Sequence, residues 1–289
     1  MEIRTVGVCG AGAMGTGIAH VAAQAGFQVI LRDVETAQVE RPVATIDGLM
    51  QKAIAKGKLT EADRTATLGR IRTTTSLDEL AEADFVIEAI FENLALKKEL
   101  FAALDRLCRP GVVLATNTSS MSITEIAAAT GRPECVVGMH FFNPAQVMRL
   151  VEVIEGYQSA PETVQTAMQM AERFGKTAIH VRKDTPGFVV NRILLPMMAE
   201  AIKVVEEGIA TPQEVDQAIT LGLNHPMGPF TLLDFTGVDI CYNAMEYFYS
   251  EFRQPQYAPP QLMKQMVRAG RYGRKAGKGF LGEYPRDTK

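Results

Sequence analysis

Two polar side chains stand where an apolar core is expected, and their types suit acid–base chemistry. Glu152 lies in the middle of the apolar run 150–154, and His140 lies within the apolar segment 139–142. A buried carboxylate is retained only with a partner that hydrogen-bonds it or carries the opposite charge. The Asn-Pro dipeptide at 143–144 supplies a turn between the two segments, so we predict that neighbouring elements bring His140 and Glu152 into contact.

An imidazole held by a carboxylate is more basic and is fixed in one tautomer, as a general acid or base requires. Taken by itself, however, the pattern favours a structural histidine that a nearby acid satisfies. Other residues must decide between these two interpretations.

Two further polar residues stand where a ligand could be held. Ser119 follows a predicted strand at 112–116, and ligands of doubly wound sheets bind outside the carboxyl ends of strands. Its alternative role is to cap the helix that begins near Ser122. Asn191 lies one helical turn after Gly187, beside a predicted domain boundary, and clefts form at such boundaries.

Lys52 and Lys56 are spaced to share one helix face and could present two ammonium groups to a phosphate. The pattern alone favours solvated surface lysines.

A glycine-rich turn follows the first predicted strand, at 5–9, and opens a helix. Its residues are Gly10, Ala11, Gly12, Ala13, Met14 and Gly15. In a dinucleotide site the first glycine permits the tight turn, the second admits a pyrophosphate, and the third lets the helix pack on the strand. The free amides at the helix start favour phosphate. We therefore predict a dinucleotide site; the alternative is a similar turn that binds no nucleotide.

Asp33 follows the second predicted strand, where an acid accepts hydrogen bonds from the adenosine ribose. Its charge would repel the 2′-phosphate of NADP, so the sequence favours NAD. Arg32 could compensate if its side chain turned toward the ribose.

Short β-branched runs alternate with helical stretches over the first 185 residues. The expected strands are 5–9, 28–31, 85–90, 112–116, 135–142 and 177–181. This alternation predicts an α/β fold, with a Rossmann-type doubly wound, mostly parallel sheet covered by helices on both faces. A helical excursion near 36–70 carries Lys52 and Lys56.

The proline and glycine at 186–187 mark a boundary, which predicts a dinucleotide-binding domain over 1–185 and an all-helical domain over 186–289. Thr211 and Glu214, with a proline between them, have the pattern of a capped helix start. One long helix is expected from an apolar stripe of Val190, Ile193, Leu194, Met197, Ala201 and Val205.

The second domain is rich in Met and Phe, and this richness suggests a homodimer through that domain, with ordinary core packing as the alternative. The residues concerned are Met197, Met198, Phe230, Phe235, Met245 and Phe248.

Composition excludes several classes of protein. A net charge of −3 offers no global positive field for nucleic acid or an anionic membrane, and no long uncharged apolar run could span a membrane. The four cysteines, Cys9, Cys108, Cys135 and Cys241, lack the paired spacing of a metal or redox site. We expect Cys9 and Cys135 inside strands as core thiols, no metal, and a cytoplasmic protein, since no signal peptide precedes the first strand.

Taken together, the motifs resemble those of the NAD-dependent (S)-3-hydroxyacyl-CoA dehydrogenases, most closely the short-chain 3-hydroxybutyryl-CoA type. The matching segments follow the family's order over nearly the whole chain: 10–15, 88–93, 117–120, 140–144, 150–154, 186–192 and 225–229. Gln146, where the family usually has proline, and Leu281, at a position often aromatic, depart from the pattern.

The resemblance implies that His140 is the general base, Glu152 its orienting partner, and Ser119 and Asn191 the residues that position the substrate oxygen. It implies an acyl-CoA substrate such as acetoacetyl-CoA, a place in fatty acid metabolism, and coenzyme A contacts by Lys52 and Lys56. It also implies cofactor contacts by Asp33, Glu92, Lys97, Ser119, Asn143 and Lys275.

Two alternatives stay open on the sequence. One is a dehydrogenase of the same architecture that acts on a small free hydroxy acid. The other is a non-catalytic dinucleotide-binding protein, although such a protein has no use for His140, Glu152, Ser119 and Asn191 together.

Overall fold

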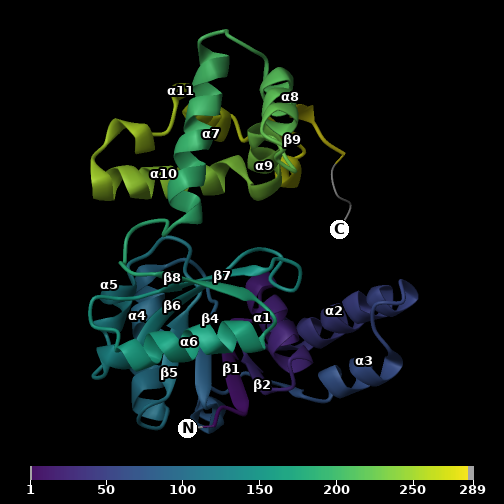
Figure 1. The fold of residues 1–289 in the computed structure, drawn as a ribbon, viewed down its shortest axis with the longest axis vertical. Helices are drawn as coiled ribbons and strands as arrows, with labels where there is room; N and C mark the ends of the chain where they lie inside the picture. Colours follow the sequence, from purple (N-terminus) through teal and green to yellow (C-terminus); the bar gives the residue numbers. More distant parts are fainter. Residues whose placement is uncertain (1, 286–289) are drawn as a thin grey trace. The chain divides into compact units, whose positions relative to one another are not determined.

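The computed structural model describes residues 2–285, and the chain divides into two compact units, one up to Phe188 and one from Val189 onward. The first unit is built around a sheet, and the second consists mainly of helices (Figure 1).

The sheet of the first unit has the strand order β3-β2-β1-β4-β5-β6-β7-β8. Every neighbouring pair is parallel except β6 and β7, which are antiparallel. The order turns back between β1 and β4, the point at which doubly wound sheets bind ligands. The strands are β1 (Thr5–Cys9), β2 (Gln28–Arg32), β3 (Ile71–Thr74), β4 (Phe85–Glu88), β5 (Val113–Thr116), β6 (Val136–Phe141), β7 (Leu150–Ile154) and β8 (Thr177–Val181).

Helices cover both faces of this sheet. One apolar cluster packs α1 and α6 on one face, and a second packs α4, α5 and η1 on the other; Figure 1 shows α6 on the near side and α4 and α5 behind. The elements are α1 (Ala13–Gln24), α2 (Thr36–Ala55), α3 (Glu61–Leu68), η1 (Asp78–Glu82), α4 (Leu94–Leu107), α5 (Ile123–Ala127), η2 (Pro133–Cys135) and α6 (Pro161–Arg173). The predicted α/β fold is confirmed.

The helical excursion consists of two helices, α2 and α3, which lie side by side and are joined by an ion pair between Arg64 and Asp47 (Figure 1). The sequence analysis missed the short edge strand β3 that follows them, because four residues with one apolar side chain carry little strand signal. Cys135 was wrongly expected in a strand. It lies in η2, before β6, and is only half-buried, whereas Cys9 is fully buried in β1.

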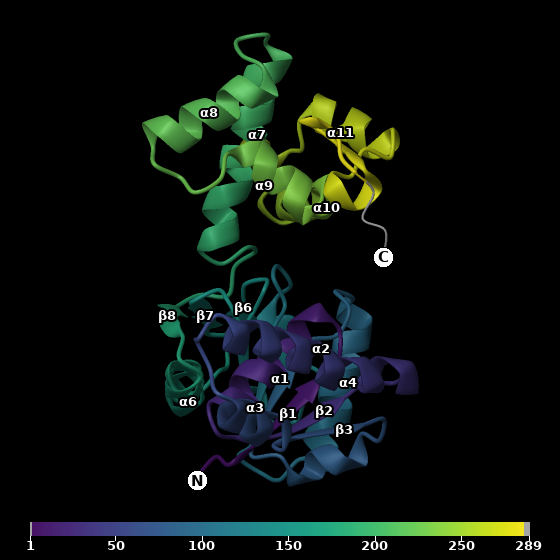
Figure 2. The ribbon, with the colours of Figure 1, turned by 90° about the vertical axis from the view of Figure 1, so that its right-hand side faces the viewer.

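The second unit is helical, as predicted, with one addition that the sequence analysis did not foresee. This addition is a short hairpin of β9 (Lys278–Gly279) and β10 (Gly282–Glu283). The helices are α7 (Val190–Glu206), α8 (Pro212–Gly222), α9 (Pro229–Thr236), α10 (Val238–Phe252), η3 (Pro255–Tyr257), α11 (Gln261–Arg268) and η4 (Arg274–Ala276). Figure 2 shows α7 to α11.

The predicted start of α8 is confirmed. The Thr211 side chain accepts a hydrogen bond from the Glu214 backbone N–H, and the Glu214 carboxylate accepts one from the Thr211 N–H. These bonds lower the pKa of Glu214, because they favour its ionised form.

The buried face of α7 differs from the predicted stripe. Of the predicted stripe, Ala201 is buried and Leu194 and Val205 are partly buried against the core, but Ile193 is 68% exposed. The other buried residues of α7 are Leu195, Met198, Ala199 and Ile202. A helix with apolar residues on most of its surface does not reveal from spacing alone which stripe faces the core.

Most of the expected surplus of Met and Phe lies in the second unit's own core. Met198, Phe230, Met245 and Phe248 are fully buried there, and Phe235 is 52% exposed. These buried residues therefore give no support to a dimer.

Among the helices of residues 2–285, none is long and apolar enough to cross a membrane.

The glycines of the phosphate-binding turn meet distinct steric demands. Gly10 has φ +100°, and a Cβ there would lie 2.5 Å from the Ala89 carbonyl oxygen. A Cβ on Gly15 would lie 1.7 Å from the Gly10 carbonyl oxygen, whereas a Cβ on Gly12 would meet no atom within 4 Å. Gly10 and Gly15 are thus required by the fold, and the space in front of Gly12 is open.

We therefore expect Gly15→Ala to destabilise the protein and Gly12→Ala to leave its stability nearly unchanged. The added methyl group at Gly15 can be accommodated only by moving backbone, at a cost of roughly 1–3 kcal/mol in the free energy of unfolding. Denaturant unfolding of the two variants measures the difference. Equal stability of both would contradict this assignment of roles.

Candidate active site

Asp33 is hydrogen-bonded to the glycine turn at one edge of the sheet. Asp33, just after β2, accepts hydrogen bonds from the Ala11 N–H (2.7 Å) and the Val34 N–H (2.7 Å). The carboxylate is thus fixed against the turn, and its remaining acceptor positions suit a hydroxyl group.

Arg32, the residue before it, is directed elsewhere. Its Nε donates to the Thr75 carbonyl oxygen at 3.4 Å, beyond the end of β3. In this arrangement the guanidinium is engaged at the sheet edge, and the negative charge of Asp33 dominates beside the turn.

His140 and Glu152 are brought together as the sequence predicts. They are paired residues of the antiparallel strands β6 and β7, and His140 Nδ1 lies 2.8 Å from Glu152 Oε2. Both are buried, and the rings of Phe142 and Phe188 lie against the imidazole. With Nδ1–H donating to the carboxylate, Nε2 carries the lone pair that can take a proton.

Ser119 and Asn117 lie in the loop after β5. Asn117 Oδ1 accepts from the Phe141 N–H at 2.8 Å, which ties this loop to the end of β6. The cap of α5 is Ser122, whose hydroxyl accepts from the Glu125 N–H, so Ser119 does not serve as that cap. Ser119 is exposed, and its own N–H donates to Glu92 Oε1 at 3.0 Å.

Lys97 and Glu92 are also connected. The Lys97 ammonium is buried and lies 3.3 Å from Glu92 Oε2, and it donates to the buried Glu88 at 2.6 Å. The sequence analysis did not single out Glu88 as a site residue, although a glutamate at the end of an apolar strand is the same signal that revealed Glu152.

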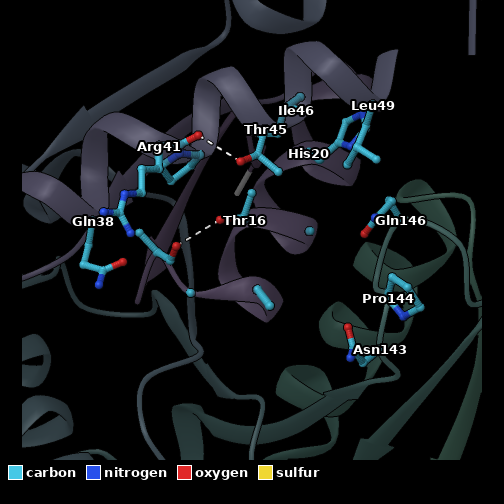
Figure 3. Close-up of a pocket in the computed structure, with 15 residues that line it drawn as sticks. Thr16, His20, Gln38, Arg41, Thr45, Ile46, Leu49, Asn143, Pro144 and Gln146 are labelled. Carbon is cyan, nitrogen blue, oxygen red and sulfur yellow. Dashed lines mark hydrogen bonds between the residues drawn. The ribbon is translucent and has the colours of Figure 1, made fainter. Parts of the chain in front are cut away.

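A cavity of about 460 Å³ opens beside the turn and runs along α2 (Figure 3). Side chains of α2 form one wall, and the segment Asn143 to Gln146 lies opposite. The lining residues are Ala11, Gly12, Ala13, Thr16, Gly17, His20, Gln38, Arg41, Pro42, Thr45, Ile46, Leu49, Asn143, Pro144 and Gln146. The α2 residues that line this cavity were not predicted from the sequence, because exposed helix residues of mixed type carry no motif.

Lys52 and Lys56 do not line this cavity, but they continue its wall. Thr45, Leu49, Lys52 and Lys56 follow one another at steps of three and four residues, so they share a face of α2. Both lysines are exposed; Lys52 lies in the last helical turn and Lys56 is the C-cap.

The buried imidazole of His20 lines the cavity, and the ammonium of Lys176 binds the loop opposite α2. Lys176 donates to the carbonyl oxygens of Ala145 (2.6 Å) and Met148 (2.9 Å), which holds the loop opposite α2. Neither ring nitrogen of His20 has a hydrogen-bond partner within residues 2–285. Burial lowers the pKa of His20, and the Lys176 charge lowers it further.

Asn191 and Lys275 belong to the second unit. Asn191 is half-buried in the first turn of α7, and Lys275 in η4 donates to Asp239 at 2.8 Å.

Within the described residues no cluster of His, Cys, Asp or Glu could hold a metal ion. Burial raises the pKa of the Cys9 thiol, so this cysteine is an inert core residue.

Comparisons with known proteins cover both units. Residues 5–185 match the model of the 3-hydroxyacyl-CoA dehydrogenase NAD binding domain, and residues 187–283 match that of the 3-hydroxyacyl-CoA dehydrogenase C-terminal domain. A probable 3-hydroxybutyryl-CoA dehydrogenase of Bacillus subtilis is 49% identical over 97% of each chain. The 3-hydroxybutyryl-CoA dehydrogenase of Clostridioides difficile is 42% identical over 94% of this chain and 97% of its own.

Among solved structures, the (S)-3-hydroxybutyryl-CoA dehydrogenase of Ralstonia eutropha superposes with a TM-score of 0.95 at 46% identity, covering 99% of this chain and 100% of that one. Matches to both domain models and to full-length relatives leave no part of the fold unaccounted for between residues 5 and 283. The chain therefore belongs to the 3-hydroxyacyl-CoA dehydrogenase family and is an NAD-dependent dehydrogenase.

Proposed function

We propose that the protein reversibly oxidises an (S)-3-hydroxyacyl-CoA, with 3-hydroxybutyryl-CoA as the substrate that the names of its relatives suggest. The observation that carries the proposal is the buried pair of His140 and Glu152, 2.8 Å apart, on the strands that continue the dinucleotide-binding sheet. A proton acceptor at this position is what alcohol oxidation needs from the protein.

The residues of the turn fit a dinucleotide. A pyrophosphate fits the open space before Gly12 and the free amides at the start of α1. A ribose diol fits the Asp33 carboxylate beside them. NAD bound there would supply the hydride acceptor. Glu92, Lys97, Asn143 and Lys275 are the further cofactor contacts that we propose from the family resemblance.

In the oxidation, His140 Nε2 takes the proton of the substrate hydroxyl group. Glu152 stabilises the imidazolium that forms, because its carboxylate already holds the protonated Nδ1. In the reverse direction the protonated His140 donates to the forming alkoxide. Ser119 and Asn191 position the substrate oxygen in this proposal.

We further propose that coenzyme A is held along α2, where Lys52 and Lys56 face its phosphates. The free thiols of the four cysteines suit a reducing compartment, so we propose that the enzyme is cytoplasmic. Its place in fatty acid metabolism is proposed from the family resemblance.

The second unit also exposes large apolar side chains, which we propose are covered by a second copy. They are Ile193, Ile209, Leu221, Leu223, Phe235 and Ile240. Sedimentation analysis of the purified protein should give the mass of a dimer, and a charged residue at Leu221 or Leu223 should shift it toward a monomer. A monomeric wild-type protein would exclude this proposal.

Assays with acetoacetyl-CoA and with free acetoacetate test the substrate class. We expect NADH oxidation with the thioester and little with the free acid. Activity with the free acid alone would favour the hydroxy acid dehydrogenase, and activity with neither would exclude both proposed substrates.

His140→Ala should lower kcat by roughly 100- to 10,000-fold while NADH binding changes little, because only proton transfer is lost. Glu152→Gln should also lower kcat, since it removes the charge that stabilises the imidazolium. A matched control is His180→Ala, because His180 Nε2 also contacts a carboxylate, that of Glu155, at 2.9 Å. If His140→Ala kept half of wild-type kcat, the assignment of His140 would be wrong.

Wild-type protein should use NADH with a higher kcat/KM than NADPH. Asp33→Asn keeps an acceptor for the Ala11 N–H but removes the charge, so the ratio of kcat/KM with NADH to kcat/KM with NADPH should fall by roughly five- to tenfold. Steady-state kinetics with both cofactors measure this ratio. A preference of the wild type for NADPH would show that Arg32 governs the pocket.

Replacing Lys52 and Lys56 with Ala should raise KM for acetoacetyl-CoA several-fold, and the effect should shrink at high salt, because exposed charges are screened. A truncated pantetheine thioester, which lacks the nucleotide phosphates, should be unaffected. Lys58→Ala is the control, since Lys58 lies beyond the end of α2. An equal loss with both substrates would assign the two lysines a structural role.

A further inference from the structure

The first unit contains a buried ion pair between Lys97, a proposed cofactor contact, and Glu88, to which no role has been given so far. Glu88, the last residue of β4, is fully buried. Its Oε1 accepts from Lys97 Nζ at 2.6 Å and from the Ile90 N–H at 2.7 Å, and its Oε2 accepts from Thr116 Oγ1 at 2.6 Å. One carboxylate thus joins the end of β4 to the end of β5 and to α4.

Stability does not explain this pair. Lys97 is 1% exposed and lies near the start of α4, where the helix dipole disfavours a cation. Buried ion pairs are often no more stabilising than well-packed apolar residues of similar size. A locally unfavourable residue of this kind is expected where a functional geometry is held.

The pair leads directly to the loop that carries Ser119. Lys97 Nζ also lies 3.3 Å from Glu92 Oε2, and Glu92 is 41% exposed. Glu92 Oε1 accepts from the Thr118 hydroxyl and from the Ser119 N–H. A continuous path of charged groups and hydrogen bonds therefore runs from Glu88 through Lys97 and Glu92 to the backbone of Ser119.

We propose that Glu88 is a positioning residue, which holds the Lys97 ammonium so that Lys97 fixes the Glu92 carboxylate and the Ser119 backbone at the carboxyl edge of the sheet. The inference rests on the proposed function, in which Glu92 and Ser119 meet cofactor and substrate. In a doubly wound sheet a dinucleotide crosses the switch point, so its second half lies over the β4 side, where these residues are.

The consequence of losing Glu88 follows from charge. Without the Glu88 carboxylate, the buried ammonium keeps its attraction to Glu92 and draws this side chain inward. Glu92 then releases the Ser119 N–H, and the loop loses its fixed position. A displacement of about 1 Å in such a group can cost roughly 100-fold in rate.

The test compares Glu88→Gln, Lys97→Met and the double variant by thermal midpoint, by NADH dissociation constant and by kcat and KM with acetoacetyl-CoA. Glu88→Gln should lower both the thermal midpoint and kcat/KM, the latter by roughly 10- to 100-fold. The double variant leaves no unpaired buried charge, so it should regain most of the thermal midpoint while its kcat/KM stays low. Lys97→Met alone measures the NADH affinity lost with that proposed cofactor contact. Glu88→Gln keeps Lys97, so its loss of kcat/KM and NADH affinity reports on positioning.

Asp105→Asn is the matched control. Asp105 Oδ1 pairs with Arg132 Nε at 2.7 Å near the other end of α4. This substitution should lower the thermal midpoint and leave kcat/KM and NADH affinity unchanged.

A folded Glu88→Gln variant with wild-type kcat/KM and NADH affinity would overturn the inference and leave Glu88 a purely structural role. If Glu88→Gln does not fold, Thr116→Val decides, because it removes a hydrogen bond to Glu88 Oε2 and replaces no proposed cofactor contact. It should lower kcat/KM and NADH affinity, and wild-type values of both would overturn the inference. A wild-type protein inactive on acetoacetyl-CoA refutes the proposed function separately, and the NADH dissociation constants of the variants then decide about Glu88.

Discussion

The parallel alignment of β1, β2, β4, β5 and β6 is the constraint on which the site depends. Because these strands point the same way, their carboxyl ends meet at one edge, together with the amino ends of the helices that follow them. Asp33, Glu88, Ser119 and His140 are far apart in the chain and reach this edge for that reason alone. The antiparallel return of β7 then places Glu152 directly beside His140.

Buried acids serve two different purposes in the two units. In the second unit, Asp216 and Asp234 accept hydrogen bonds from backbone N–H groups, those of Phe230 and Thr231 and those of Phe280 and Leu281, and so hold loops and helix starts. In the first unit, Glu152 holds an imidazole, and Glu88 holds an ammonium as well as the Ile90 N–H. A carboxylate that contacts an imidazole or an ammonium favours the charged form of that group, which hydrogen bonds to backbone alone do not do.

The excursion of α2 and α3 adds a wall to an otherwise ordinary doubly wound sheet. α2 extends the surface beside the glycine turn, and its face from Thr45 to Lys56 passes from a cavity wall to exposed ammonium groups. This is the surface that we propose for coenzyme A. Lys176 secures the opposite wall through the Ala145 and Met148 carbonyl groups.

The sequence by itself determined the elements with strong local signals: the turn from Gly10 to Gly15, the strands around it and the capped start of α8. It also revealed His140 and Glu152, since a polar residue inside an apolar run must find a partner. The edge strand β3, the buried face of α7, the cavity along α2 and the path from Glu88 to Ser119 were decided by tertiary structure. Each of these depends on which side chains from distant segments pack together, and local spacing does not encode that choice.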